Sequence, residues 1–216
     1  MNPIVKQLVP GIVTHVVNLG GYVTKTKLLK LLYLVDVEYY RAHRVTLTAF
    51  DWKFFHLGPW AGEYDRVIDD LVSGGDLIER AGSKSEYETR FYHVAEPKEL
   101  GRLFPTSSDE FTVRRVLSTW ASASTGEILD YVYFHTEPME NGVRNQPLDF
   151  SSVIQVLPEQ YVRPSSGTSP REIEKLRRKF RLQNEEAARE KPFAFTPPRY
   201  DEEFQKGVAK LESSEQ

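Results

Sequence analysis

Apolar residues recur at helical spacing in the first two elements expected along the chain. The first helix is predicted from about Pro3 to Asn18, where the apolar repeat is near 3.6 residues. The second is predicted from Lys25 to about Ala42, with Thr24 as its N-terminal cap. Because leucine and valine cover more than one face of this second segment, it should lie at the centre of the fold, buried on most sides.

A helix and a hairpin are expected next. Gly58-Pro59 closes a β-prone connection and is expected to start a third helix, from Trp60 to Val72. Two short segments follow it, Leu77 to Glu79 and Thr89 to Ala95, and the second alternates as a strand does. Helices followed by a hairpin resemble a winged-helix arrangement.

Two more helices complete the predicted globular part. One runs from Asp109 to Trp120 and is expected to turn Phe111 inward; the other runs from Thr125 to Phe134 behind a cap at Ser124 or Thr125. The fold class expected is therefore mainly α, of the α+β type. We expect a compact helical domain with a small β-hairpin, winged-helix-like, followed by a charged helical extension.

A change of composition marks a boundary near residue 163. Residues 163–216 are much more densely charged than residues 1–162, and Pro164 to Pro170 reads as a linker. We expect a globular domain over 1–162 and an extension over 163–216. The extension should hold a charged helix from Pro170 to about Lys191, and a weak last helix from Asp201 to Leu211.

Composition narrows the function classes. The chain has 216 residues, 40% of them hydrophobic, and a net charge of −3, so nothing draws it as a whole to nucleic acid or an anionic membrane. It has no cysteine, and its apolar N-terminal segment lacks the features of a signal peptide. We expect a cytoplasmic protein that does not enter membranes.

The sequence carries no motif for known catalytic or metal chemistry. Its five histidines include no pair at helical i, i+4 spacing, and the GPWAG stretch at Gly58 to Gly62 has tryptophan where a hydrolase elbow has serine. Acidic pairs such as Asp69-Asp70 are more typical of a solvated helix face. We therefore expect no catalytic residues, no cofactor and no metal. An enzyme with a dispersed site is the least favoured class.

Aromatic residues are the candidates for binding a partner. Tyrosine and tryptophan are common anchors of protein interfaces, although most of those in this chain should belong to the core. The candidate partner-binding residues are Tyr39, Tyr40, Trp52, Phe55, His56, Trp60, Phe180, Phe193, Phe195, Tyr200 and Phe204. The last five lie in the extension, which is expected either to contact a partner or to pack back on its own domain.

A DNA-binding regulator is the alternative that the winged-helix-like order raises. The helix before the hairpin, WAGEYDRVIDDLV, is acidic and would repel phosphate. The only basic cluster of the globular part that favours this reading, Lys25, Lys27 and Lys30, is small. Direct DNA binding is therefore the less favoured function.

Three segments together resemble the Panacea domain of bacterial antitoxins. They are KLLKLLYLVD from Lys27 to Asp36, Thr46-Leu47-Thr48, and FFHLGP from Phe54 to Pro59. Family members typically show KLLYxAD, PLT or PIT, and YGPxP at these places. The resemblance covers residues 5 to about 160 and includes the segments TEPM and PLDF near its end. Two residues depart from it: His56 replaces a common tyrosine, and Trp60 replaces a small apolar residue.

The resemblance implies a function without catalysis. Panacea-domain antitoxins, which include the SocA-like ones, bind a cognate toxin protein directly, and SocA-type members deliver the toxin to a AAA+ protease. It implies a toxin–antitoxin system of a bacterium, phage or mobile element. The identity of the toxin, the oligomeric state and the choice between occlusion and proteolytic delivery stay open.

Overall fold

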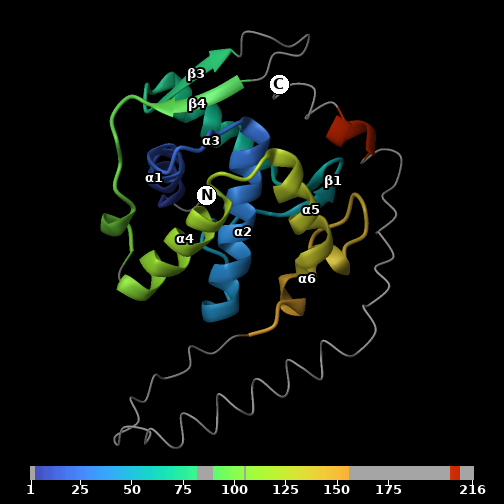
Figure 1. The fold of residues 1–216 in the computed structure, drawn as a ribbon. Coiled ribbons are helices and arrows are strands. Elements are labelled where there is room, and N and C mark those ends of the chain that lie inside the picture. The colour runs from blue at the N-terminus through green and yellow to red at the C-terminus, as the bar shows by residue number, and fades with distance from the viewer. Residues whose placement is uncertain (1–2, 82–89, 105, 156–204, 210–216) are drawn as a thin grey trace, which may run out of the picture. The chain divides into compact units, whose positions relative to one another are not determined.

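The computed structural model describes residues 3–81, 90–104, 106–155 and 205–209. This part of the chain is mainly helical, with two small antiparallel hairpins (Figure 1). The helices are α1 (Val5–Asn18), α2 (Lys25–His43), α3 (Gly62–Ser73), α4 (Ser107–Trp120), α5 (Thr125–His135) and α6 (Glu137–Glu140). The strands are β1 (Lys53–Phe55), β2 (Gly58–Trp60), β3 (Leu77–Ala81) and β4 (Arg90–Val94), and the 3-10 turns are η1 (Leu100–Arg102) and η2 (Phe150–Ser152).

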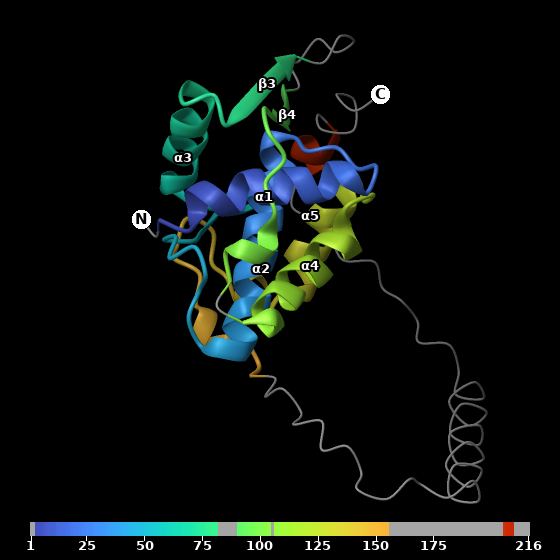
Figure 2. The same cartoon turned by 90° about the vertical axis from the view of Figure 1, so that its left-hand side faces the viewer.

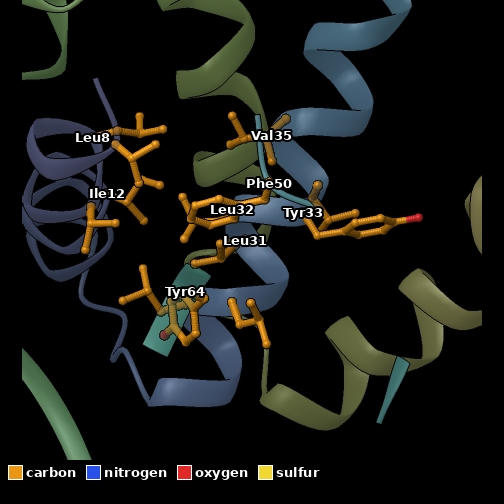
Figure 3. Packing of buried hydrophobic residues seen from close by; sticks show 14 of the residues in the cluster. Leu8, Ile12, Leu31, Leu32, Tyr33, Val35, Phe50 and Tyr64 are labelled. Carbon is orange, nitrogen blue, oxygen red and sulfur yellow. The ribbon is translucent and has the colours of Figure 1, made fainter. Parts of the chain in front are cut away.

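Helix α2 lies at the centre of the described fold, as its wide apolar surface predicts. Every residue from 27 to 37 is buried, because α1, α4 and α5 surround the helix (Figures 1 and 2). Figure 3 shows Leu8 and Ile12 of α1 facing Leu32 of α2, whereas Tyr33 extends away from α1. The core is therefore built on two sides of one helix.

Local signals place the starts of α2 and α5 where the sequence predicts them. The Thr24 side chain accepts a hydrogen bond from the N–H of Lys27 at the start of α2. Ser124 caps α5 and forms a capping box with Glu127, whose side chain returns to the Ser124 backbone. The hairpin β3–β4 is also confirmed, paired from Leu77 with Val94 onward.

The predicted start of the third helix is wrong. Gly58–Trp60 forms the strand β2, paired with β1 so that Phe54 faces Pro59, and α3 begins only at Gly62. Gly58 has φ +90°, a conformation that glycine adopts without strain, and it follows directly on the turn of this hairpin. The glycine and proline therefore shape a hairpin and not a helix start.

The prediction for Phe111 is also wrong. Its side chain is 67% exposed, whereas Val113, Val116 and Leu117 of α4 are buried. Two residues before Val113 along a helix correspond to a rotation of roughly 200°, so Phe111 and Val113 lie on opposite faces. The face of α4 that packs on the core excludes Phe111.

The described residues bear on the C-terminal extension at one place. Gln205 to Ala209 are helical and belong to the same compact unit as residues 1–157. The boundary expected after residue 162, the linker and the charged helix from Pro170 lie outside the described residues. None of the helices that the structure describes is long and apolar enough to cross a membrane.

Candidate functional site

Exposed aromatic side chains gather on the β1–β2 hairpin. Along β1 the side chains alternate, so Phe54 is buried and Phe55 is 38% exposed. The ring centroid of Phe55 lies 4.0 Å from that of His56 and 5.5 Å from that of Trp60. We call these three residues the hairpin cluster. It contains three of the partner-binding residues predicted from the sequence.

A neighbouring loop holds the outer edge of this hairpin. The N–H of Phe54 donates to the carbonyl of Gln146 over 3.0 Å, and the N–H of Asn145 donates to the carbonyl of Phe54 over 2.6 Å. The N–H of Leu148 donates to the carbonyl of Trp52 over 2.9 Å. Strand β1 is therefore hydrogen-bonded on both edges, to β2 on one side and to this loop on the other.

A buried carboxylate positions the connection that leads into β1. Asp36 of α2 accepts hydrogen bonds from the N–H and the hydroxyl of Thr48, and from the indole N–H of Trp52 at 2.7 Å. Burial raises the pKa of Asp36 to about 6, although these donors act in the opposite direction. The three bonds attach this connection to the middle of α2.

A buried lysine positions the other strand. Lys30 of α2 is 2% exposed, and its Nζ donates to the carbonyl of Pro59 over 2.6 Å. Burial lowers the pKa of this ammonium group to about 7. Asp36 and Lys30 therefore fix the hairpin from one helix, and both belong to the segment KLLKLLYLVD.

A second buried lysine closes the turn between α4 and α5. The Nζ of Lys27 donates to the carbonyls of Ala121 and Ala123 at 2.9 and 2.5 Å, and lies 4.3 Å from the ring centre of Tyr22. The basic cluster considered for DNA binding is thus not a surface feature. Two of its three lysines are buried, and the third, Lys25, pairs with Asp65 at 2.7 Å.

The other predicted partner-binding residues that the structure describes, Tyr39, Tyr40 and Trp52, do not join the hairpin cluster. Trp52 is 3% exposed, so its ring belongs to the core in this structure. Tyr39 and Tyr40 are half-buried near the end of α2, where Tyr39 stacks on His43 and Tyr40 packs against Phe150. Those of the extension lie outside the described residues: Phe180, Phe193, Phe195, Tyr200 and Phe204.

Sequence reasoning missed the charged network at the end of α2. Arg41 donates two hydrogen bonds to Glu137, at 2.5 and 2.6 Å, and a third to Glu38 at 3.0 Å. Glu38 also accepts from Arg115 of α4 at 2.8 Å. The sequence offered one indication of this network, namely charged residues on a helix that is otherwise apolar. Such residues require partners when they are buried.

One side-chain pair has the composition of a nucleophile and its base, but not the hydrogen-bond pattern. Nε2 of His15 lies 3.2 Å from the hydroxyl of Ser118, while the guanidinium of Arg114 lies 3.4 Å from Nδ1. A base for serine needs an accepting Nε2, oriented by a carboxylate on Nδ1. Here the arginine donates to Nδ1, so Nε2 carries the hydrogen and donates to serine.

Two grooves lie apart from the hairpin. One, of about 620 Å³, is lined by charged and apolar residues between α1 and the segment before α4, including Lys6 and Lys98. The other, of about 350 Å³, lies between α2, α4 and α5 beside Arg115 and Tyr131. Among the described residues, no three metal-ligating side chains converge.

Comparison with known proteins adds no relative. No family model matches the sequence, and no curated protein or solved structure matches it either. The resemblance to the Panacea domain stays a prediction that rests on the residues quoted for it.

Proposed function

We propose that this protein is an antitoxin that neutralises a cognate bacterial toxin by direct protein–protein binding, with the hairpin cluster in the contact surface. One observation carries the proposal: the exposed Phe55 and His56 and the half-exposed Trp60 form an aromatic surface on a hairpin whose strand β1 is bonded along both edges. Aromatic side chains are frequent hot spots of protein interfaces. The resemblance of the sequence to the Panacea domain is the reason for proposing a toxin as the partner.

The hydrogen bonds that hold the hairpin in place favour this use. Ordering a loop during association reduces affinity, and a surface that is already ordered avoids that loss. Lys30 and Asp36 hold the two strands from α2, and the 145–148 loop holds the outer edge of β1. The cluster therefore meets a partner in one prepared arrangement.

Two modes of neutralisation follow from the family resemblance. In the first, the bound antitoxin occludes the toxin. In the second, it acts as an adaptor that delivers the toxin to a AAA+ protease. Both modes begin with the same binding step. They differ in whether the bound toxin is then degraded.

Co-expression with the neighbouring gene product tests the proposal. Growth rescue together with a complex that co-purifies would support occlusion, whereas rescue with falling toxin levels would support proteolytic delivery. Toxicity that this chain does not relieve, or a neighbour without toxicity, would contradict the antitoxin proposal.

The alternative, a winged-helix-like DNA-binding regulator, draws on the order of α3 and the hairpin β3–β4. Helix α3 carries four acidic residues against one arginine, which leaves an unfavourable surface for phosphate even though Asp70 pairs with Lys6 at 3.0 Å. Strong, salt-sensitive binding of the purified protein to its own promoter would favour the regulator over the antitoxin.

A further inference from the structure

A short C-terminal helical turn, Gln205 to Ala209, lies against the tip of the β1–β2 hairpin. A Cβ atom placed on Gly207 would overlap Cδ2 of Leu57 and lie 3.3 Å from its Cγ. Gly207 and Val208 are half-buried, whereas Gln205 and Ala209 are exposed. The turn therefore has a covered side at Gly207 and a solvent side at Ala209.

Leu57 places this contact beside the hairpin cluster. It stands in the two-residue turn between β1 and β2, directly after His56. Any segment that covers Leu57 is next to the surface assigned above to partner binding. A toxin that used the cluster and the tip of the hairpin would meet the C-terminal turn there.

We propose that Gln205 to Ala209 is an intramolecular occupant of the hairpin tip, which a partner protein displaces when it binds. Docking of the turn is a property of this chain alone. The competition with a partner rests on the proposed function. The two halves are therefore tested by separate measurements.

Glycine at position 207 is what permits the contact. Without a Cβ, the helical backbone approaches Leu57 more closely than any other residue would allow. Glycine is also a poor helix former, less favourable than alanine by about 1 kcal/mol. A turn free in solution would gain from any larger helix former at this position, whereas the docked turn would lose its contact.

The size of the contact suits a displaceable segment. A single helical turn is not stable by itself in water, so its order depends on what it packs against. Gly207 meets the side chain of Leu57, and one such contact is far smaller than a stable protein interface. A partner that covers the hairpin is expected to replace it readily.

Hydrogen exchange of the full-length protein tests the docking without any partner. Gly207→Leu should speed exchange several-fold in peptides that cover the hairpin and the C-terminal turn. Ala209→Leu adds the same side chain on the exposed side of the same turn and should leave both peptides unchanged. Unchanged exchange in Gly207→Leu, with the folded core intact by thermal melting, would overturn the docking.

A double-mutant cycle identifies the contacting residue. In a Leu57→Ala background the side chain that collides with position 207 is gone, so Gly207→Leu should have little further effect on exchange. Additive effects of the two substitutions would show that the turn docks elsewhere and would overturn the assignment of Leu57 as its contact.

Affinity for the co-expressed toxin tests the competition. If the turn is docked about nine-tenths of the time, its release by Gly207→Leu should tighten binding roughly tenfold. Ala209→Leu should bind as the wild type does. Faster hydrogen exchange with unchanged or weaker toxin binding would overturn the competition. If no toxin binds the wild type, the proposed function fails, whereas the exchange result still decides the docking.

Discussion

The indole N–H of Trp52 donates a hydrogen bond of 2.7 Å to Oδ2 of Asp36, a residue in the middle of α2. Both side chains are buried, and the same carboxylate accepts two hydrogen bonds from Thr48. The bond joins the central helix to the connection that leads into β1. The position of the hairpin cluster therefore depends on a polar contact inside the core.

Trp52→Phe should destabilise the fold by about 1–3 kcal/mol, because it removes one donor from a buried carboxylate. The free energy of unfolding in urea measures the effect. Trp60→Phe is the matched control, since Trp60 is half-exposed. This variant should lose less free energy of unfolding than Trp52→Phe. Equal losses of stability in the two variants would show that the hydrogen bond to Asp36 does not add to the stability of the fold.

The stability contributed by Lys30 should increase with pH. Burial lowers the pKa of Lys30 to about 7 in the folded protein from the ordinary 10.5, so between these values the unfolded chain binds more protons. The free energy of unfolding then rises by up to about 1.4 kcal/mol per pH unit in that window. The buried tyrosines, whose pKa values burial raises, oppose this trend only near and above pH 10.

Urea unfolding at several pH values between 7 and 10 measures this slope. Lys30→Met should flatten it, because the titrating group is gone. Lys25→Met, a change at an exposed lysine of the same helix, should keep the wild-type slope. A slope that survives in Lys30→Met would assign the pH dependence to another group.

Phe55→Ala should weaken toxin binding by at least about 1 kcal/mol if the hairpin cluster is part of the interface. Calorimetry on the complex from co-expression measures the change. Phe111→Ala is the control, because Phe111 is an exposed phenylalanine on α4. Similar losses at both positions, or none at Phe55, would contradict the placement of the interface on the hairpin.

Ser124→Ala should destabilise the protein by about 1 kcal/mol, because the serine hydroxyl caps the N-terminus of α5 and completes its capping box. Thermal unfolding measures the loss. Ser108→Ala changes an exposed serine inside the first turn of α4 and should have a smaller effect. A loss no greater than that of Ser108→Ala would mean that water replaces the cap.

The segment KLLKLLYLVD carries the resemblance to the Panacea domain and also forms the central part of α2. Its leucines predict a buried helix, and the helix is buried. Its charged residues have a less obvious role, since Lys27, Lys30 and Asp36 bond to groups that follow far along the chain. A buried charge requires such partners, but the sequence does not say which ones.

The sequence by itself determined the elements that depend on near neighbours. The spans of α1, α2 and α5, the cap at Thr24 and the capping box at Ser124 involve residues three or four positions apart, and the strand pattern of β4 involves residues two apart. These predictions hold because the residues that decide them are already together in the unfolded chain. The placement of Phe111 failed because it depends on which face of α4 meets α2.

Only the tertiary structure decided which aromatic residues form a surface. Trp52 and Phe55 are three residues apart and similar in hydrophobic character, yet Trp52 is buried in the core, where it bonds to Asp36, and Phe55 is 38% exposed. The hairpin that carries Phe55 also needs Lys30 and the 145–148 loop, which are distant in sequence. Contacts between such distant residues form only when the chain folds, so no local pattern encodes them.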